Sequence, residues 1–299
     1  MPMPPHPAPA ESGPWHRLAS VVTCPVCGGS VTLAGSALCC SAGHAFDRAR
    51  QGYVSLLTGA MRVPSADTAS MVTARADVLA AGHFAPLATA LARHVARLAP
   101  AGHGSVVLDA GAGTGYYLGH VLDALPGAHG LGLDASKFAA RRAARAHPRL
   151  GAAVWDVWRP LPVRGGAVDV LTNVFAPRNA PEFHRVLAPH GALLVVTPTP
   201  RHLAQLRAAL PLLSVDDAKE RRLRDALARH FEPATREVHE YDRDLDAPDL
   251  ARLVAMGPSA HHVGDPAALT ARLGRGLRVT LSFRISVHRP LRPGPSASG

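Results

Sequence analysis

The chain has 299 residues, 47% of them hydrophobic, which is enough for one large domain or two with a sizeable buried core. Lys and Arg number 32 against 22 Asp and Glu, so the formal net charge is +10, and only Lys137 and Lys219 are lysines. Such an arginine excess suits a polyanionic partner such as RNA, although a GC-rich coding bias toward Arg, Ala, Gly and Pro also contributes. No apolar run approaches the roughly 18 residues of a membrane span, and the N-terminus lacks the features of a signal peptide. We therefore expect a cytoplasmic protein with no membrane partner.

The two ends of the chain have the composition of disordered segments. Residues 1–17 are rich in Pro, Ala and His without an apolar period, which is typical of a disordered leader. Residues 290–299 have the same character and are expected to form a disordered tail. The four cysteines lie together between positions 24 and 40, as metal ligands do, rather than spread as in a disulfide framework.

The block Cys24-Pro-Val-Cys27 is followed after twelve residues by Cys40-Ser-Ala-Gly-His44. Two residues between the first pair let both thiolates face one metal across a tight turn, and the second pair can close the tetrahedron from another turn. We therefore predict a zinc-binding module over residues 18–60.

Unliganded thiols and a redox Cys-x-x-Cys motif are the alternatives to zinc. The redox motif needs a following helix, and the glycines at 28 and 29 argue against one. Cys39 is a spare that could replace Cys40, and we favour Cys40 because it starts the Cys-x-x-x-His turn. A short hairpin is expected around Val31, Leu33 and Leu38.

The segment from Phe46 to Leu57 interleaves arginines with aromatic residues. This pattern suits single-stranded RNA, where bases stack while phosphates are neutralised. Ordinary packing is an equal alternative for Tyr53 and Leu56. Residues 58–68 are expected to form a mobile linker.

Apolar residues recur at three- and four-residue steps from Thr68 to Leu98, which predicts helical structure with a break at residues 82–84. We assign residues 61–100 to a helical linker before the sheet domain. Phe84 either reaches over a cofactor pocket, against the adenine or methionine part, or packs in the core, and the pattern alone favours the core.

Strand-like and helix-like segments alternate through residues 101–289, which predicts an α/β domain with a doubly wound, mostly parallel sheet. We expect strands at 105–109, 129–134, 152–155, 167–174 and 191–197, and helices at 115–125, 136–147, 179–188 and 202–213. Arginine-rich helices near 217–230 and 245–256 and an apolar closing strand over 277–287 complete the domain.

A loop containing Gly111, Gly113 and Gly115 follows the apolar strand that ends in Asp109. Glycines let such a loop approach a ligand at the carboxyl end of a parallel strand. Asp134 closes the next apolar run, where it could hold ribose hydroxyls. The spacing is G-x-G-x-G with an acid before it, whereas a dinucleotide site requires G-x-G-x-x-G with an acid roughly 20 residues on. The pattern resembles the S-adenosylmethionine pocket of class I methyltransferases; a dinucleotide site and a turn without ligand are the alternatives.

Three further residues are expected at the ligand edge of the sheet. Asp156 follows the third strand, where it could accept a hydrogen bond from the adenine amino group or simply lie in a surface loop. Asn173 opens a turn that ends at Asn179, where the reacting base should be presented. This turn lacks the Asn/Asp-Pro-Pro-aromatic sequence with which many class I enzymes bind an exocyclic amine. A ring nitrogen, carbon or oxygen is therefore favoured as the atom that accepts the methyl group. His202 starts a helix on the same edge and either touches the cofactor or caps the helix.

From Cys24 to about Arg289, these motifs in this order resemble the RlmA/TlrB family of 23S rRNA (guanine-N1)-methyltransferases. The motifs are the zinc block, the segment 46–57, residues 81–87, the glycine loop, the turn 173–179 and residues 197–203. The resemblance implies a class I methyltransferase domain with S-adenosylmethionine and Zn²⁺ as cofactors. It also implies a zinc module that helps to recognise a hairpin of 23S rRNA or its large-subunit precursor, and often a homodimer whose cleft holds that hairpin. The positions that match are zinc ligands Cys24, Cys27, Cys40 and His44, and cofactor contacts Phe84, Gly113, Thr114 and His202.

The turn at Asn173 is closer to the TlrB branch, which is linked to macrolide resistance, than to the housekeeping branch, which targets a neighbouring guanine. The expected product is N1-methylguanine in the domain II hairpin beside the macrolide site, with the base flipped out of the hairpin for the reaction. The residues name no acceptor for the guanine N1 proton, because Asp109, Asp134 and Asp156 are assigned to structure or cofactor. A small-molecule methyltransferase and a non-catalytic RNA-binding protein are the alternatives.

Overall fold

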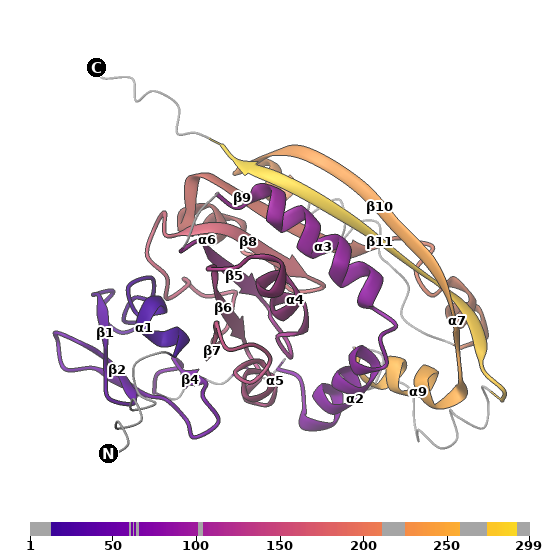
Figure 1. Ribbon diagram of the computed structural model, residues 1–299, viewed down its shortest axis with the longest axis horizontal. Helices are drawn as coiled ribbons and strands as arrows, with labels where there is room; N and C mark the ends of the chain where they lie inside the picture. The colour runs from indigo at the N-terminus through magenta and orange to yellow at the C-terminus, as the bar shows by residue number, and fades with distance from the viewer. Residues whose placement is uncertain are drawn as a thin grey trace, which may run out of the picture.

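The computed structural model describes residues 13–59, 61, 63, 66–100, 104–210, 225–257 and 274–291. Their centre is an eight-stranded sheet with the order β10-β11-β9-β8-β5-β6-β7-β4 (Figure 1). The strands are β4 (Val54–Ser55), β5 (Val106–Ala110), β6 (His129–Asp134), β7 (Leu150–Val154), β8 (Val168–Val174), β9 (Leu187–Pro198), β10 (Phe231–Leu245) and β11 (Leu277–Pro290). The strands from β4 to β9 pair in parallel, and β11 runs antiparallel to both of its neighbours. The predicted α/β class with a mostly parallel sheet is confirmed.

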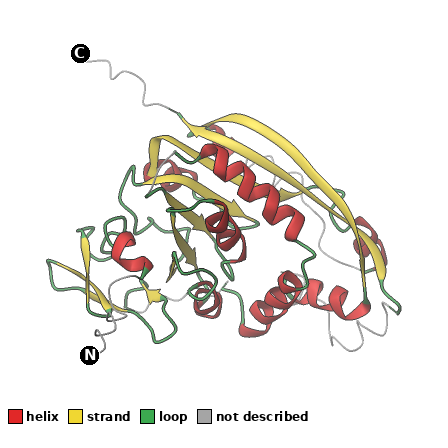
Figure 2. Cartoon of the chain, in the orientation of Figure 1, coloured by secondary structure: helices red, strands yellow, loops and turns green. Residues whose placement is uncertain are grey.

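Helices cover both faces of this sheet (Figure 2). They are α1 (Pro14–Leu18), α2 (Ala69–Ala80), α3 (Ala85–Leu98), α4 (Tyr116–Ala124), α5 (Lys137–Ala143), α6 (Ala180–Val186), α7 (Ala204–Ala209) and α9 (Ala247–Ala255). Side chains alternate between the faces along a strand, so Val107 of β5 belongs to the buried cluster that includes α3 and α4, while Leu108 belongs to the cluster that includes α1 and α6. Among the described helices, none is long and apolar enough to cross a membrane.

The N-terminal module is a small antiparallel sheet of β1 (Val31–Ala34), β2 (Ala37–Cys40) and β3 (Ala45–Asp47). The expected hairpin is present, since Leu33 pairs with Leu38. After β3 the chain enters the large sheet as β4, which pairs with β7 in parallel. The module is therefore joined to the large sheet rather than tethered beside it.

The predicted disordered leader spans residues 1–17, of which residues 1–12 lie outside the described residues. The prediction is wrong for residues 14–17, which belong to helix α1. Trp15 in α1 is 1% exposed, and its Nε1 donates a hydrogen bond to the Gly52 carbonyl at 3.2 Å. Leu18 packs on β7 at Gly151, where an added Cβ would lie 2.5 Å from Leu18 Cδ1. The predicted tail from residue 292 onward also lies outside the described residues.

The segment 61–100 is more than a helical linker. Thr68 caps α2 by accepting the Met71 N–H at 3.3 Å, and α3 is an amphipathic helix whose apolar residues are buried against the sheet. Phe84, between the two helices, is 2% exposed and packs on Phe283 of β11, with ring centroids 5.8 Å apart. The structure thus places Phe84 in the core, as its pattern favoured.

The 15-residue strand β10 is absent from the predicted elements. Most of its residues are exposed and charged or polar, because it is an edge strand, so no apolar alternation marks it in the sequence. The predicted helix 179–188 ends at Val186 because β9 begins at the next residue. Helix 202–213 is realised as α7 and helix 245–256 as α9, while residues 211–224 lie outside the described part of the chain.

Candidate cofactor and metal sites

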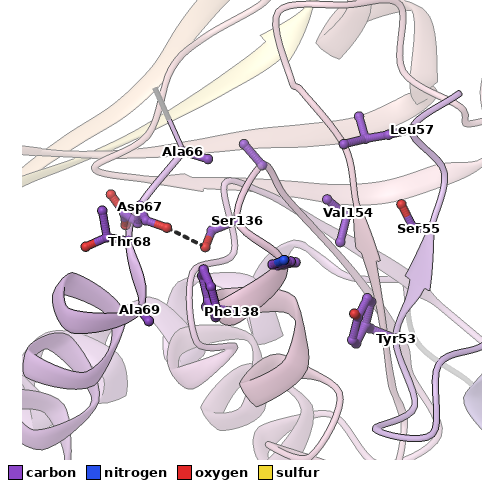
Figure 3. A pocket seen from close by; sticks show the side chains of 12 residues that line it. Tyr53, Ser55, Leu57, Ala66, Asp67, Thr68, Ala69, Ser136, Phe138 and Val154 are labelled. Atoms are coloured by element: carbon purple, nitrogen blue, oxygen red, sulfur yellow. Dashed lines mark hydrogen bonds between the residues drawn. The ribbon is translucent and has the colours of Figure 1, made fainter. Parts of the chain in front are cut away.

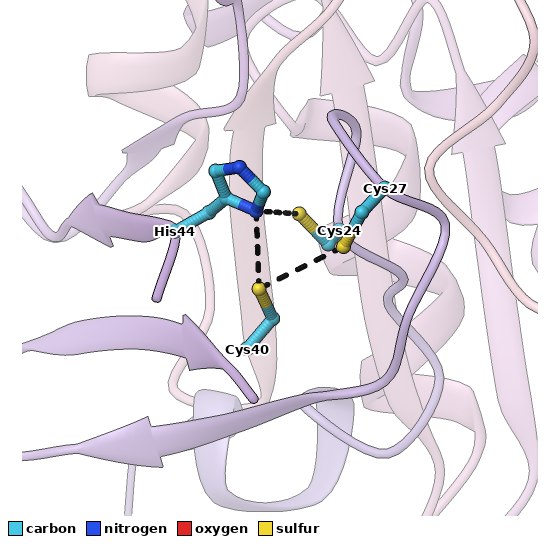
Figure 4. Close-up of side chains that lie close together, drawn as sticks. All are labelled: Cys24, Cys27, Cys40 and His44. Carbon is cyan, nitrogen blue, oxygen red and sulfur yellow. Dashed lines mark hydrogen bonds between the residues drawn. The ribbon is translucent and has the colours of Figure 1, made fainter. Parts of the chain in front are cut away.

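Four side chains of the zinc block converge on one point (Figure 4). The ligand atoms of Cys24, Cys27, Cys40 and His44 all lie within 4.8 Å of one another. Cys40 Sγ lies 3.3 Å from His44 Nδ1 and 3.8 Å from Cys27 Sγ, and Cys24 Sγ lies 3.6 Å from His44 Nδ1. Ligand atoms around a tetrahedral zinc with bonds of about 2.0–2.3 Å are separated by about 3.5–3.8 Å. The donor set and its dimensions therefore fit Zn²⁺.

Two tight turns present these ligands. The Gly28 N–H donates to the Cys24 carbonyl at 2.8 Å, and the Gly43 N–H donates to the Cys40 carbonyl at 3.0 Å. Burial raises the pKa of Cys40, but hydrogen bonds from the backbone and side chain of His44 oppose it, and the pKa falls to about 6. This favours the thiolate form that binds a metal. Cys39 precedes Cys40 in β2, where successive side chains point to opposite faces, and it is not part of the cluster.

The segment just before the metal cluster is fixed to the connection between β7 and β8. The Thr23 N–H donates to the Pro162 carbonyl at 3.0 Å, and the Arg164 N–H donates to the Val21 carbonyl at 2.9 Å. Cys24 itself is 1% exposed and belongs to the apolar core that contains strands of the large sheet. Metal binding and the packing of this core are therefore coupled.

The glycine loop lies at the carboxyl end of β5. Gly111 has a φ of 88°, and an added Cβ would lie only 2.2 Å from the Cβ of Ala176, in the turn after β8. Gly115 starts α4, and an added Cβ there would lie 2.9 Å from the Cα of Ala143 in α5. Glycine at these positions lets the loop contact both the β8 turn and α5.

Asp134 fastens this loop to the end of β6. Its Oδ2 accepts the Gly113 N–H and its Oδ1 accepts the Ser136 N–H, both at 2.8 Å. Burial raises the pKa of Asp134, although these two hydrogen bonds oppose the rise. Each carboxylate oxygen retains a lone pair for a ligand hydroxyl. The predicted ribose contact of Asp134, like the contact of the half-buried Thr114 next to Gly113, stays a prediction.

Asp109 is buried beneath the loop at 1% exposure. Burial raises its pKa to about 7, the Thr172 hydroxyl opposes the rise by donating a hydrogen bond at 2.9 Å, and the nearby charge of Asp134 adds to it. The side chain contacts the end of β8 rather than solvent. Its geometry therefore indicates a structural group beneath the pocket, while the predicted cofactor contact stays untested.

The larger described cavity, of about 610 Å³, lies beside Asp134 rather than over the glycine loop (Figure 3). A hydrogen bond from Ser136 Oγ to the Asp67 carbonyl at 2.7 Å joins the segment before α2 to the loop after β6. The lining residues are Tyr53, Ser55, Leu57, Ala66, Asp67, Thr68, Ala69, Ala135, Ser136, Lys137, Phe138 and Val154. None of the predicted cofactor residues lines it, although Ala135 directly follows Asp134. Thr114 and Gly115 instead line a smaller cavity of about 350 Å³.

Arg75 of α2 is a site residue that the sequence analysis missed. Its guanidinium pairs with Asp67 and donates to the Met256 carbonyl at 2.9 Å, and a Cβ added to Gly113 would lie 3.7 Å from it. It therefore faces the glycine loop and offsets the negative charge of Asp134. The signal was available, because Arg75 falls four residues after Met71 on the apolar face of the predicted helix.

The turn after β8 combines a buried amide with an exposed ring. Asn173 is fully buried, and its Nδ2 donates to the carbonyls of Ala110 and Pro177, both at 2.9 Å. Its Oδ1 is buried without a hydrogen-bond partner. Phe175, two residues on, is 44% exposed and has a φ of 55°. The predicted placement of this turn beside the glycine loop is realised through Ala176.

His202 and Phe84 both belong to an aromatic cluster at this edge. The members of the aromatic cluster are Phe84, Tyr117, Phe175, His202, Tyr241 and Phe283. The His202 ring packs 4.7 Å from Phe283, and its Nδ1 accepts the Ser282 N–H at 3.3 Å. Burial, helped by the charge of Arg207, lowers the pKa of His202 to about 4. His202 is therefore neutral at pH 7 with its proton on Nε2, which makes it a hydrogen-bond donor rather than a base.

Asp156 is engaged in its own turn. Its Oδ1 accepts the Trp158 N–H at 3.0 Å, and its Oδ2 lies 3.8 Å from Arg159 Nε. It follows β7 as predicted, but it does not line the cavity beside Asp134. The adenine contact therefore stays a prediction, with local turn formation as its demonstrated role.

We predict one tightly bound zinc per chain. Replacing both thiolates in Cys24→Ser and Cys27→Ser together should abolish zinc retention in metal analysis and destabilise the folded protein by several kcal/mol, because metal binding and folding are linked. Cys39→Ser is the matched control and should retain zinc. Zinc retained by the double variant, or lost from the control, would contradict the assignment.

The raised pKa of Asp109 predicts a pH-dependent stability. Because the folded-state pKa of about 7 exceeds the ordinary value of 3.8, folding favours the protonated form, so stability falls as pH rises from about 4 through 7. The effect reaches about 4 kcal/mol at most. Asp109→Asn should therefore raise the melting temperature strongly at pH 8 and much less at pH 4.5, whereas the exposed Asp244→Asn control should show no such trend. A constant difference between wild type and Asp109→Asn would refute the ionisation argument.

Comparison with known proteins agrees with this geometry. Residues 22–59 match the zinc-ribbon family model described as RlmA, N-terminal. The 23S rRNA (guanine(748)-N(1))-methyltransferase of Streptomyces fradiae is 50% identical over 271 residues, covering 90% of this chain and 96% of that protein. A candidate 23S rRNA (guanine-N(1)-)-methyltransferase of Micromonospora griseorubida is 54% identical over 288 residues, covering 90% and 97%. A candidate enzyme of the same description from Bacillus subtilis is 34% identical over 197 residues, covering 64% and 69%. With its zinc ribbon and glycine loop in place, the chain belongs to the RlmA/TlrB family of 23S rRNA (guanine-N1)-methyltransferases.

Proposed function

We propose that this protein methylates N1 of a guanine in 23S rRNA, at the position that corresponds to the target of the Streptomyces fradiae enzyme. The observation that carries the proposal is the 50% identity to that enzyme over 96% of its length. The two candidate sites are the Cys3His cluster and the glycine loop with Asp134, which accepts a hydrogen bond from it. Both belong to a single folded body.

The residues around the glycine loop suit S-adenosylmethionine. That cofactor supplies an electrophilic methyl group on a positively charged sulfur. Asp134 would hold the ribose hydroxyls, and the neighbouring cavity, with its apolar Leu57, Phe138 and Val154, offers space for the purine. Arg75 faces the loop and can pair with a carboxylate. The unpaired buried Oδ1 of Asn173 is a further acceptor, since leaving such an atom unsatisfied costs about 1–3 kcal/mol.

A ring nitrogen suits this site better than an exocyclic amine. Asn173 is fully buried and bridges the carbonyls of Ala110 and Pro177 through Nδ2, so its side chain is not presented to a substrate amine. Rate enhancement would come mainly from holding guanine N1 in line with the methyl and excluding water. His202 is too weak a base to take the N1 proton, and its Nδ1 already accepts the Ser282 N–H.

The finer proposal concerns the RNA and the biological role. We propose that the target lies in the domain II hairpin beside the macrolide site, that the methyl group confers macrolide resistance, and that two copies bind the hairpin in a homodimer cleft. Exposed Arg48 and Arg50 on the zinc-ribbon side support RNA binding by this module. Methylation of the neighbouring guanine is the alternative within the family. A small-molecule methyltransferase would have no use for the zinc ribbon.

Cofactor binding should depend on the glycine loop in a graded way. Gly113→Arg should abolish binding in calorimetry, because the long side chain fills the loop and sets a second cation beside Arg75. Asp134→Ala should weaken binding roughly 10- to 100-fold through loss of charge-assisted hydrogen bonds, and His202→Ala should weaken it less. The exposed Asp244→Ala serves as control. An unchanged dissociation constant in Asp134→Ala would remove its ribose role.

The product is tested on RNA. A methyl on N1 blocks Watson–Crick pairing, so reverse transcriptase should stop one nucleotide before the modified guanine in large-subunit RNA from cells that express the gene. RNA from cells expressing the Gly113→Arg variant should show no stop. If the stop falls on the neighbouring guanine, only the target position is wrong. If wild type gives no stop while the purified protein methylates a small molecule, the RNA proposal fails.

A further inference from the structure

The ring of Phe175 lies where a substrate base would have to approach the glycine loop. It follows β8, whose carboxyl end adjoins β5, and the next residue, Ala176, is the residue that Gly111 contacts. The ring is nevertheless 44% exposed, although apolar neighbours surround it. Single exposed apolar side chains are common on protein surfaces, so the exposure of Phe175 has weight only together with its backbone conformation and its ring contacts.

The backbone at Phe175 is strained. Its φ of 55° lies in the left-handed region, which is unusual for a bulky residue. Glycine would adopt this backbone conformation without the steric strain that a side chain causes. The conformation is held by the surrounding structure: the Phe175 N–H donates to the Val196 carbonyl at 3.2 Å, and Asn173 Nδ2 holds the Pro177 carbonyl. A phenylalanine at a position where glycine would fit more easily points to a use for its ring.

The aromatic cluster supports the ring from behind and from the side. The centroid of the Phe175 ring lies 5.4 Å from that of Phe283, with an angle of 46° between the ring planes. It lies 6.3 Å from the centroid of Tyr117, with an angle of 76°. Phe283 is fully buried and Tyr117 belongs to the first turn of α4, directly after the glycine loop. The ring of Phe175 is therefore fixed in orientation while part of it remains open to a ligand.

We propose that Phe175 is the platform on which the target guanine stacks once it has left the RNA hairpin. The inference rests on the proposed function. A purine that is flipped out loses the stacking of its neighbours, and an aromatic side chain replaces this contact without occupying the base edge. Stacking on Phe175 keeps the N1 edge in the plane of the base free to meet the methyl group. Exposed Phe138 and Trp158 follow β6 and β7, and among the described ring contacts neither ring packs in the aromatic cluster; Trp158 meets the turn only through its backbone carbonyl, which accepts a hydrogen bond from Asn179 Nδ2 at 3.2 Å.

The test pairs a protein change with an RNA change, using the full-length, zinc-loaded protein. Phe175→Gly removes the ring, and the relief of the left-handed backbone offsets part of the packing lost with Phe283 and Tyr117, so the variant is assayed well below its measured melting temperature. Its affinity for an unmodified target hairpin and its single-turnover methylation rate should together drop roughly 5- to 150-fold. For the same hairpin with an abasic nucleotide at the target position, wild type and Phe175→Gly should bind equally, because there is no base to stack. S-adenosylmethionine affinity should be unchanged in calorimetry.

Two further variants give the matched comparisons. Phe175→Tyr should restore methylation to near the wild-type rate because it keeps the ring, and Trp158→Ala should have less than a tenth of the effect of Phe175→Gly. Equal losses on normal and abasic hairpins, or equal losses in Trp158→Ala and Phe175→Gly, would overturn the proposal. If wild type methylates the hairpin and Phe175→Gly does so at the same rate, Phe175 is not the platform. If wild type itself leaves the hairpin unmethylated, the proposed function fails instead.

Discussion

The candidate site depends on the direct contact between the glycine loop and the turn after β8. Gly111 and Ala176 approach so closely that any side chain at position 111 would lie within 2.2 Å of the Ala176 methyl. Parallel pairing of β5 with β8 brings the two segments to the same edge of the sheet, and Asn173 bridges them through the Ala110 carbonyl. One segment has the form of a cofactor loop, and the other carries the exposed ring of Phe175. Their contact sets the distance between the glycine loop and the Phe175 ring.

The zinc ribbon contributes to the same body. Trp15 and Leu18 pack on β7, and β4 extends the large sheet beyond β7. Residues of β4 and of the following segment, including Ser55 and Leu57, also line the cavity beside Asp134. Because this wall of the cavity is built by the chain that leaves the ribbon, a change in metal binding would also alter the cavity beside Asp134.

The sequence predicted the parts of the fold whose burial leaves a periodic record. β5, β6 and β8 are buried on both faces and appear as apolar runs, and the glycine positions mark the loop that follows β5. β10 left no such record because one edge and most of its side chains face solvent. Trp15 lies in a proline-rich segment whose composition indicates disorder. Its burial depends on packing at Gly151, which is far along the chain and cannot be inferred from local pattern. Zinc-ligand identity was predictable from spacing. For Arg75 the sequence marked its place on the apolar face of a helix, but its contact with the glycine loop depends on tertiary packing.

The proposed target atom, a ring nitrogen, fits the different roles of Asn173 and Phe175 in the turn after β8. An exocyclic amine projects beyond the base and can be oriented by amide and carbonyl groups that surround it. N1 lies within the ring edge, so a group that grips the edge competes with the methyl group for space. Asn173 is accordingly turned inward to hold the backbone, and Phe175 presents a face rather than a hydrogen-bonding edge. A contact with the face of the base restrains its plane and leaves N1 accessible, which is the geometry that methyl transfer to this atom requires.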